Sequence, residues 1–305
     1  MTSIGETVAA PPRTSPKRPW RPLGHRHLRG SDFTWTIAFI LPYAAVFLAF
    51  VVYPVGYALW MARDPALYAA LAEDPLYLTT LVNTLLFVAF GVNVKMFLAL
   101  VLSGFFVRRD WWVRALLFIY MVPWVLASVQ AFISFHWMLI GETGLIDGLL
   151  LAASGIEGPI WFNHRWLALA CNIVAYIWKW MPFWTLIFLA GRSAIPQVLY
   201  DSAEIDGATG PRRFLHVTVP MLANLYLLCT LLSVIWTLGD FNTAYFVSAG
   251  GPSSTSDVLT TLGFHYTFER ANPALGVAAM MTALPMLVPV VIVLLRKLDT
   301  GEVQL

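Results

Sequence analysis

Six long apolar runs divide the sequence, and they constrain the fold more than any other feature. The runs cover residues 35–61, 78–106, 115–140, 167–191, 220–239 and 274–296. Each has the roughly 20 apolar residues that a helix needs to cross about 30 Å of hydrocarbon. Because backbone polar groups in lipid must be satisfied within the segment, we predict an all-α, polytopic membrane protein with six transmembrane helices.

The composition excludes several classes of protein. Of the 305 residues 59% are hydrophobic and 12% are charged, whereas an ordinary soluble domain has about 25% charged residues. The basic residues lie in short segments between the apolar runs rather than in one patch, which does not favour nucleic-acid binding. Cys171 and Cys229 both lie in apolar runs, so we expect buried free thiols rather than a disulfide framework.

Lys and Arg residues are distributed unequally between the two sides of the predicted bundle. Fourteen lie on the side that carries both termini and three lie on the other side, while Lys95 and Lys179 fall within spans. The positive-inside rule therefore predicts that both termini are cytoplasmic.

The segment before the first apolar run is rich in Pro and Arg and has little to bury. We predict a disordered basic tail over residues 1–32 and a single six-span domain over residues 33–305. The first apolar run is longer than that of a secretory signal peptide, so we predict that it is retained as a span.

The longest polar interruption between two spans is "LYDSAEIDGATGPRRFLHVTVPML", residues 199–222. Pro196 suits the first position of a helix, Gly207 suits the left-handed residue that ends one, and Pro211 can begin a second. We predict two short helices over about residues 196–216, joined at both ends to transmembrane helices. A partner that moved this segment would move those helices, although the spacing alone is equally typical of an ordinary charged loop.

The run "DSAEIDGATGPRRFLHVTVP" resembles the coupling motif of ABC importer permeases, in which Glu-Ala-Ala is followed by Gly four residues later and then by Ile/Val-x-x-Pro. Asp201 stands where Glu is usual and Ser202 where Ala is usual, so the carboxylate reaches less far toward the arginine expected on an ATPase. The residues that the resemblance assigns to ATPase coupling are Asp201, Ser202, Ala203, Asp206, Gly207 and Ala208.

Four segments in order narrow the resemblance to the sugar-uptake permeases of the maltose and glycerol-phosphate type. They are "YPVGYALW", "VPW", "LAGRSAIPQVLYDSAEIDGA" and "DFNTAYFVSAGGP", and the resemblance covers nearly the whole chain after residue 35. It implies the ABC type I importer permease fold in a bacterial plasma (inner) membrane. It also implies a second homologous permease subunit, two ABC ATPase subunits that use ATP and Mg²⁺, and a periplasmic or lipid-anchored solute-binding protein.

The sequence contains none of the following nucleotide-binding, metal-binding or hydrolase motifs. None of its lysines follows a glycine-rich phosphate loop, the histidines lack an HExxH or Cys-x-x-Cys companion, and no Gly-x-Ser-x-Gly elbow occurs. We therefore expect no catalytic residue, no metal and no cofactor in this chain, and we expect ATP to be hydrolysed by the partner ATPase.

The fourth apolar run carries Tyr176, Lys179, Trp180 and Phe183 at i, i+3, i+4 and i+7, which places them on one helix face. An ionisable residue in the bilayer indicates function by default, and the alternative is an aromatic packing stripe with Lys179 paired to a neighbouring helix. In the resembling sugar permeases, solute meets this part of the fourth span. The resemblance then assigns solute binding to Trp124, Ser128, Tyr176, Lys179, Trp180, Phe183, Ser233 and Thr237.

Three further polar residues stay open in their roles. Lys95 could pair with the partner permease or meet solute, while Asp240 and Asn242 could shape a gate or dock the binding protein.

We expect import of a sugar or polyol by ATP-driven alternating access. Glycerol phosphate or another small solute is the alternative, disfavoured because the spans supply only two cations. An ATP-independent channel or secondary transporter is a further alternative.

Overall fold

The structure is a computed structural model that describes residues 31–108, 110–141 and 144–302. The chain divides into two compact units, Met1–Tyr57 and Ala58–Leu305. Every regular element of the described residues is helical, which confirms the all-α prediction. The predicted disordered tail over residues 1–32 lies almost entirely outside the described residues.

The first unit contains α1 (Ser31–Phe47), the π-helical turn η1 (Leu48–Val52) and the beginning of α2 (Tyr53–Met61). Together they form one apolar helix, Thr34–Met61, that is long enough to cross a membrane. Pro54 has no backbone N–H to donate to the carbonyl four residues earlier. Next to it, Tyr53 N–H bonds the carbonyl of Leu48, five residues earlier. The proline therefore accounts for the wider, π-helical turn of η1.

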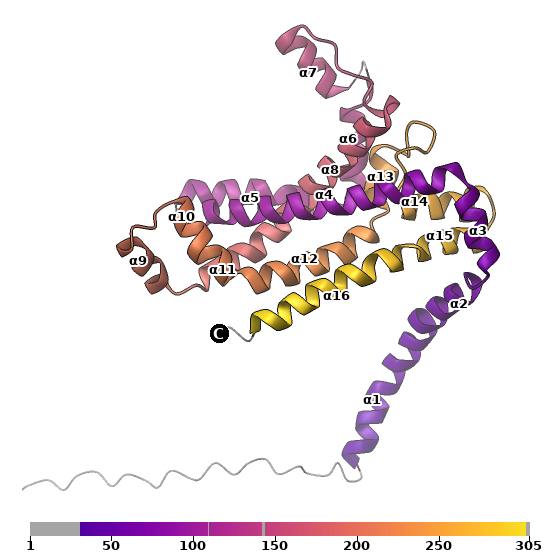
Figure 1. Ribbon diagram of the computed structural model, residues 1–305, viewed down its shortest axis with the longest axis horizontal. Helices are drawn as coiled ribbons and strands as arrows, with labels where there is room; N and C mark the ends of the chain where they lie inside the picture. Colours follow the sequence, from indigo (N-terminus) through magenta and orange to yellow (C-terminus); the bar gives the residue numbers. More distant parts are fainter. Residues whose placement is uncertain (1–30, 109, 142–143, 303–305) are drawn as a thin grey trace, which may run out of the picture. The chain divides into compact units, whose positions relative to one another are not determined.

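The second unit is a helical bundle (Figure 1). Its long helices are α4 (Pro75–Phe106), α5 (Trp111–Val125), α8 (Arg165–Ser193), α12 (Ala223–Leu238) and α16 (Ala283–Glu302). Helices α4 and α8 pack along each other, α12 packs against α4 and α16, and α5 packs against α8. Helix α4 begins where sequence chemistry directs it, because the Asp74 carboxylate accepts a hydrogen bond from Leu76 N–H at 2.8 Å and Pro75 needs no partner for a backbone N–H.

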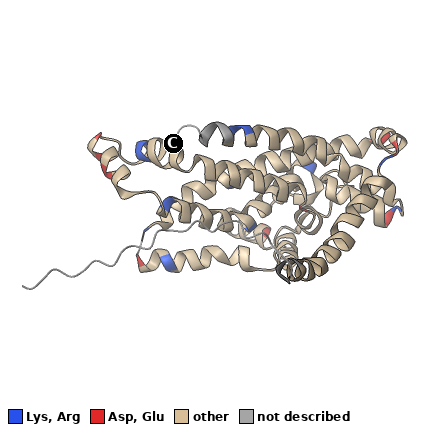
Figure 2. Cartoon of the chain, turned by 90° about the horizontal axis from the view of Figure 1, so that it is seen from below, with Lys and Arg blue, Asp and Glu red and all other residues tan. Residues whose placement is uncertain are grey.

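Shorter helices cover the ends and one flank of this bundle. They are α3 (Pro65–Glu73), α6 (Ser128–Met138), α7 (Leu145–Ser154), α9 (Gln197–Ile205), α10 (Pro211–Arg213), α11 (Val219–Met221), α13 (Asn242–Val247), α14 (Leu259–Phe264) and α15 (Pro273–Met281), with the single turns η3 (Trp161–Asn163), η4 (Phe214–Thr218) and η5 (His265–Glu269). One end of the bundle carries α9 and the opposite end carries α3 and α14 (Figure 1). We call these the α9 end and the α14 end. Charged residues gather mainly at these two ends (Figure 2).

Four helices of the described chain are individually long and apolar enough to cross a membrane: Thr34–Met61, Pro75–Phe106, Arg165–Ser193 and Pro273–Leu298. Two further spans arise only if each bent pair of helices counts as one, which gives up to six. The pair Trp111–Val125 and Ser128–Met138 is bent by 96°, and the pair Pro211–Met221 and Ala223–Leu238 by 69°.

The predicted continuous helix over residues 115–140 is therefore corrected. Helix α5 ends at Val125, and α6 starts at Ser128 in a new direction. Pro123 lies in the last turn of α5 and removes one N–H from the helical ladder, which favours a break at this position.

At the α14 end, a buried polar network fixes the loop before α14. The Asn83 side-chain amide donates to the backbone oxygens of Thr255 at 2.7 Å and Asp257 at 2.8 Å. The fully buried Asp257 carboxylate lies 3.4 Å from His265 Nε2, and His265 Nδ1 lies 2.8 Å from a Glu269 oxygen. The nearby Asp257 carboxylate raises the pKa of His265, burial opposes that rise, and Glu269 adds to it.

This network predicts a pH-dependent stability. A histidine whose folded pKa lies above the ordinary value of about 6.5 stabilises the fold fully below that pH, and its contribution is lost as the pH rises through the raised pKa. We expect the unfolding temperature of the purified chain in detergent to fall by about 2–4 °C across that window. His265→Gln removes this step. The exposed His216→Gln retains it, and an unchanged step in His265→Gln would contradict the assignment.

Candidate solute cavity and coupling segment

A cavity of about 440 Å³ lies where α8 meets the end of α12 and the start of α13. Its walls are mainly aromatic, with one carboxylate and one amide. The lining residues are Tyr176, Trp180, Trp184, Ile235, Trp236, Gly239, Asp240, Phe241 and Asn242. Two of them, Tyr176 and Trp180, were predicted from the sequence to bind solute.

The α8 side of the cavity follows from helical spacing. Tyr176, Trp180 and Trp184 recur every four residues within one 29-residue helix, so they lie on one face. Trp184 extends the predicted face by one turn, and this regular spacing is the signal by which the sequence could have identified it.

The α12 side of the cavity is shaped by the end of that helix. The chain turns at Gly239, and the Asp240 carboxylate then accepts a hydrogen bond from Thr243 N–H at 2.9 Å at the start of α13. This contact fixes Asp240 and brings Asn242 to the same cavity. The sequence leaves the roles of both residues open between a gate and a docking surface, and the structure places them beside Tyr176 and Trp180.

Trp236 joins the two sides through ring contacts. Its ring centroid lies 6.4 Å from that of Trp180, 5.7 Å from Phe183 and 5.5 Å from Trp184. Phe183 in turn stacks on Trp124 at 5.6 Å. The predicted residues Phe183 and Trp124 therefore support the aromatic wall from outside the cavity. No helical-face pattern singled out Trp236, since its contacts depend on how α12 lies against α8.

A chain of polar contacts runs behind this wall. The fully buried Lys95 of α4 donates to the Tyr176 hydroxyl at 3.2 Å. The hydroxyls of Tyr176 and Thr237 lie 2.6 Å apart, and Thr237 donates to the Ser233 carbonyl at 2.6 Å. Tyr176 must then be the donor to Thr237, so the hydrogen bonds run in one direction from α4 through α8 to α12. Lys95 thus has partners within its own chain.

Lys179 contacts a different part of the bundle. Its buried ammonium donates to the backbone oxygens of Pro123 at 2.8 Å, Trp124 at 3.2 Å and Leu126. Helix α5 ends here, so these carbonyls lack the partners that a continuing helix would give them. A cation at a helix C-terminus is favourable. The geometry matches the alternative interpretation, a lysine paired to a neighbouring helix.

The remaining predicted solute residues lie away from the cavity lining. Ser128 begins α6 beyond the break and is half-buried. Ser233 is fully buried one turn before Thr237 in α12. The structure therefore brings together six of the eight predicted residues at the aromatic wall and the polar chain behind it: Tyr176, Trp180, Phe183, Thr237, Ser233 through its carbonyl and, through Phe183, Trp124.

The predicted coupling segment folds as two short helices separated by a glycine turn. Gly207 ends α9 with φ +78°, a conformation that residues with a side chain rarely adopt. Ala208 N–H bonds the Ala203 carbonyl at 2.8 Å and Gly207 N–H bonds the Glu204 carbonyl at 3.0 Å, the pattern that closes a helix with a left-handed residue. The second helix starts at Pro211 as predicted.

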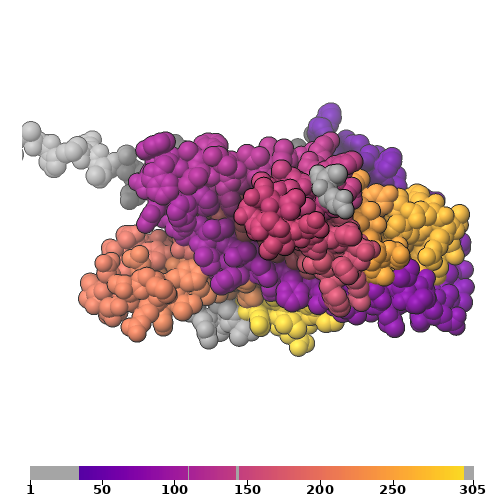
Figure 3. All heavy atoms as spheres, turned by 90° about the horizontal axis from the view of Figure 1, so that it is seen from above, coloured from indigo at the N-terminus to yellow at the C-terminus, as the bar shows by residue number. Residues whose placement is uncertain are grey.

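The outer face of α9 is open. Val198 is 70% exposed and Ile205 is 88% exposed, and Asp201 and Ser202 are exposed between them. The inner face is anchored, because the Tyr200 hydroxyl lies 3.2 Å from that of Thr218. The segment forms the orange lobe at the left edge of Figure 3. Such a mixed apolar and acidic surface suits a partner protein.

Comparisons with known proteins agree with this architecture. The sulfoquinovosyl glycerol transport system permease protein SmoG of Agrobacterium fabrum is 29% identical over 229 residues, which cover 73% of this chain and 73% of SmoG. The trehalose transport system permease protein SugA of Mycobacterium tuberculosis is 26% identical over 258 residues, covering 79% of this chain and 82% of SugA.

A solved structure shares the fold. It is a bacterial alginate ABC transporter in complex with an alginate pentasaccharide-bound periplasmic protein. One of its chains matches with a TM-score of 0.76 at 19% identity, covering 86% of this chain and 93% of that chain. Residues 95–298 match the family described as binding-protein-dependent transport system inner membrane component. The chain therefore belongs to this family, the permeases of ABC importers.

Proposed function

We propose that this permease subunit moves a neutral sugar or polyol inward through the cavity between α8 and α12. The observation that carries the proposal is the aromatic wall of Tyr176, Trp180 and Trp236 facing Asp240 and Asn242. Aromatic faces stack on the C–H faces of sugar rings. A carboxylate accepts hydrogen bonds from sugar hydroxyls, and an amide both accepts and donates them. The names of SmoG and SugA, a sulfoquinovosyl glycerol and a trehalose permease, support a carbohydrate solute, and only trehalose is uncharged.

Charge favours a neutral solute over glycerol phosphate. The residues that line the described cavity include no Lys or Arg, so none of them supplies a cation to a phosphate group. Lys95 lies behind Tyr176, to whose hydroxyl it donates. The cavity thus lacks the convergent cations that a phosphate group requires.

We further propose the arrangement of partners that the sequence suggested. Both termini lie in the cytoplasm, where two ABC ATPase subunits bind α9 and hydrolyse ATP with Mg²⁺. A periplasmic or lipid-anchored solute-binding protein delivers solute at the α14 end, and a second homologous permease completes the pathway. The basic residues near the α9 end and the exposed face of α9 support this orientation. The proposed coupling residues are Asp201, Ser202, Ala203, Asp206, Gly207 and Ala208.

We propose an alternating-access mechanism, which the attachment of the coupling segment supports. Helix α9 follows α8 after a short connection, and α10 leads through η4 and α11 into α12. A movement of α9 therefore acts on the two helices that line the cavity. In the proposed cycle, ATP closes the ATPase pair and the cavity opens outward, and hydrolysis resets it.

The cavity predicts the effect of removing its central ring. Trp236→Ala deletes contacts to three other rings and one wall of the site. We expect the KM for uptake into vesicles containing the complete importer to rise about tenfold, with the solute identified beforehand by calorimetry on the cognate binding protein. Trp137→Ala, an exposed tryptophan in α6, serves as the matched control. An unchanged KM in Trp236→Ala would contradict the site.

The role of Lys179 can be assigned by measuring the effect of its substitution on stability and on transport separately. Lys179→Met leaves three carbonyls without their donor, and unmet buried groups cost about 1–3 kcal/mol each. We expect a lower unfolding temperature than in Lys297→Met, an exposed control. If Lys179→Met unfolds like the control yet fails to transport, the residue serves solute rather than the helix break.

Gly207 tests the coupling segment. Gly207→Val places a β-branched side chain at φ +78°, whereas Asn tolerates this region. We expect Gly207→Val to lose most ATPase association in a pull-down and most ATP-dependent uptake. Gly207→Asn retains both. Full association and uptake in Gly207→Val would refute the proposed role.

A further inference from the structure

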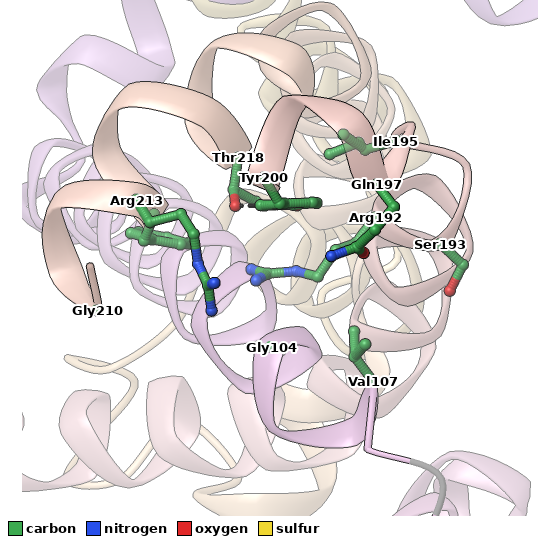
Figure 4. Close-up of a pocket in the computed structure, with 11 residues that line it drawn as sticks. Gly104, Val107, Arg192, Ser193, Ile195, Gln197, Tyr200, Gly210, Arg213 and Thr218 are labelled. Carbon is green, nitrogen blue, oxygen red and sulfur yellow. Dashed lines mark hydrogen bonds between the residues drawn. The ribbon is translucent and has the colours of Figure 1, made fainter. Parts of the chain in front are cut away.

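A second cavity, of about 460 Å³, lies at the α9 end between the coupling segment and the bundle. Arg192 at the end of α8 and Arg213 at the end of α10 both line it (Figure 4). They are joined there by the polar side chains of Ser193, Gln197, Tyr200 and Thr218. The proposed solute pathway uses none of these residues.

The two arginines face each other across this space. Figure 4 shows both guanidinium groups pointing into the same part of the cavity. The described lining residues include no carboxylate. Two like charges directed at one space repel each other, and an anion between them would turn that repulsion into attraction.

Neighbouring groups use only part of the donor capacity of these arginines. Arg192 Nη2 donates to the Leu100 carbonyl at 3.1 Å, and its Nε is buried without a hydrogen-bond partner among the described residues. Arg213 lies 3.7 Å from Glu204 in an exposed pair, which is a weak contact. Each guanidinium has five N–H donors, so several stay available to a ligand.

A hydroxyl pair adds one more donor. The hydroxyl oxygens of Tyr200 and Thr218 lie 3.2 Å apart and share a single hydrogen bond. Two hydroxyl hydrogens serve one bond, which leaves one hydrogen free for a ligand. Planar guanidinium forks together with a hydroxyl donor match the tetrahedral oxygens of a phosphate group.

We propose that this cavity binds a phosphate-type oxyanion between Arg192 and Arg213. The ligand is either free phosphate or the phosphodiester headgroup of an anionic phospholipid, and a volume of about 460 Å³ admits both. Because Arg192 belongs to α8 and Arg213 to the coupling segment, the bound anion holds these elements together. Its effect on transport rests on the proposed coupling role, whereas binding itself does not.

The experiment uses the full chain purified in detergent without phosphate. Native mass spectrometry compares retention of phosphatidylglycerol with that of phosphatidylcholine, and calorimetry measures the binding of inorganic phosphate. The test variant is Arg192→Gln with Arg213→Gln. The control is Arg212→Gln, which neutralises the adjacent exposed arginine outside the cavity lining. Arg192→Lys keeps the charge and loses the fork.

We expect the wild type to bind inorganic phosphate, to retain phosphatidylglycerol in preference to phosphatidylcholine, or to do both. The double variant lowers that affinity about tenfold or more, while Arg212→Gln stays within about twofold. Binding of both probes indicates a free-phosphate site, and binding of phosphatidylglycerol alone indicates a headgroup site. A wild type without either preference overturns the proposal even if the double variant does not fold. Equal binding in the double variant and Arg212→Gln overturns it as well.

Discussion

The hydrogen bond from Lys95 to Tyr176 is the interaction on which the core of the bundle depends. A buried ammonium is costly unless it is hydrogen-bonded. Here the contact continues from Tyr176 to Thr237, so α4, α8 and α12 each contribute one partner. If any of the three rotated or slid alone, a buried polar group would lose its partner. The same register directs Tyr176 to the cavity and brings the end of α12 beside it.

Lys179, the second buried lysine, is also hydrogen-bonded, but to backbone carbonyls rather than to a side chain. Helix α5 stops at Val125 before α6 begins at Ser128, and the last carbonyls of a helix have no intrahelical donor. Lys179 of α8 supplies the donors, so α8 is joined on one side to the polar chain and on the other to the α5–α6 break. A helix fixed on two sides is suited to carry movement from the coupling segment to the cavity.

Features that depend on local pattern could be predicted from the sequence. Hydropathy located the apolar segments but not the bends within two of them. Gly207 located the turn of the coupling segment, and four-residue spacing placed Tyr176 and Trp180 on one face. The partners of Lys179 and the position of Trp236 could not be predicted, because they depend on how α5 and α12 lie against α8. The role of Asp240 stayed open between a gate and a docking surface, because the sequence does not show how tightly the chain turns at Gly239.

In the proposed mechanism, the coupling segment controls access to the cavity near Asn242. The most direct measurement is the labelling rate of Asn242→Cys by a membrane-impermeant maleimide, in a complete importer whose Cys171 and Cys229 are replaced by Ala. We predict that trapping ATP on the ATPase subunits changes this rate, and that deletion of residues 201–208 abolishes the change. An equal rate with and without ATP, or a change that survives the deletion, would contradict the account.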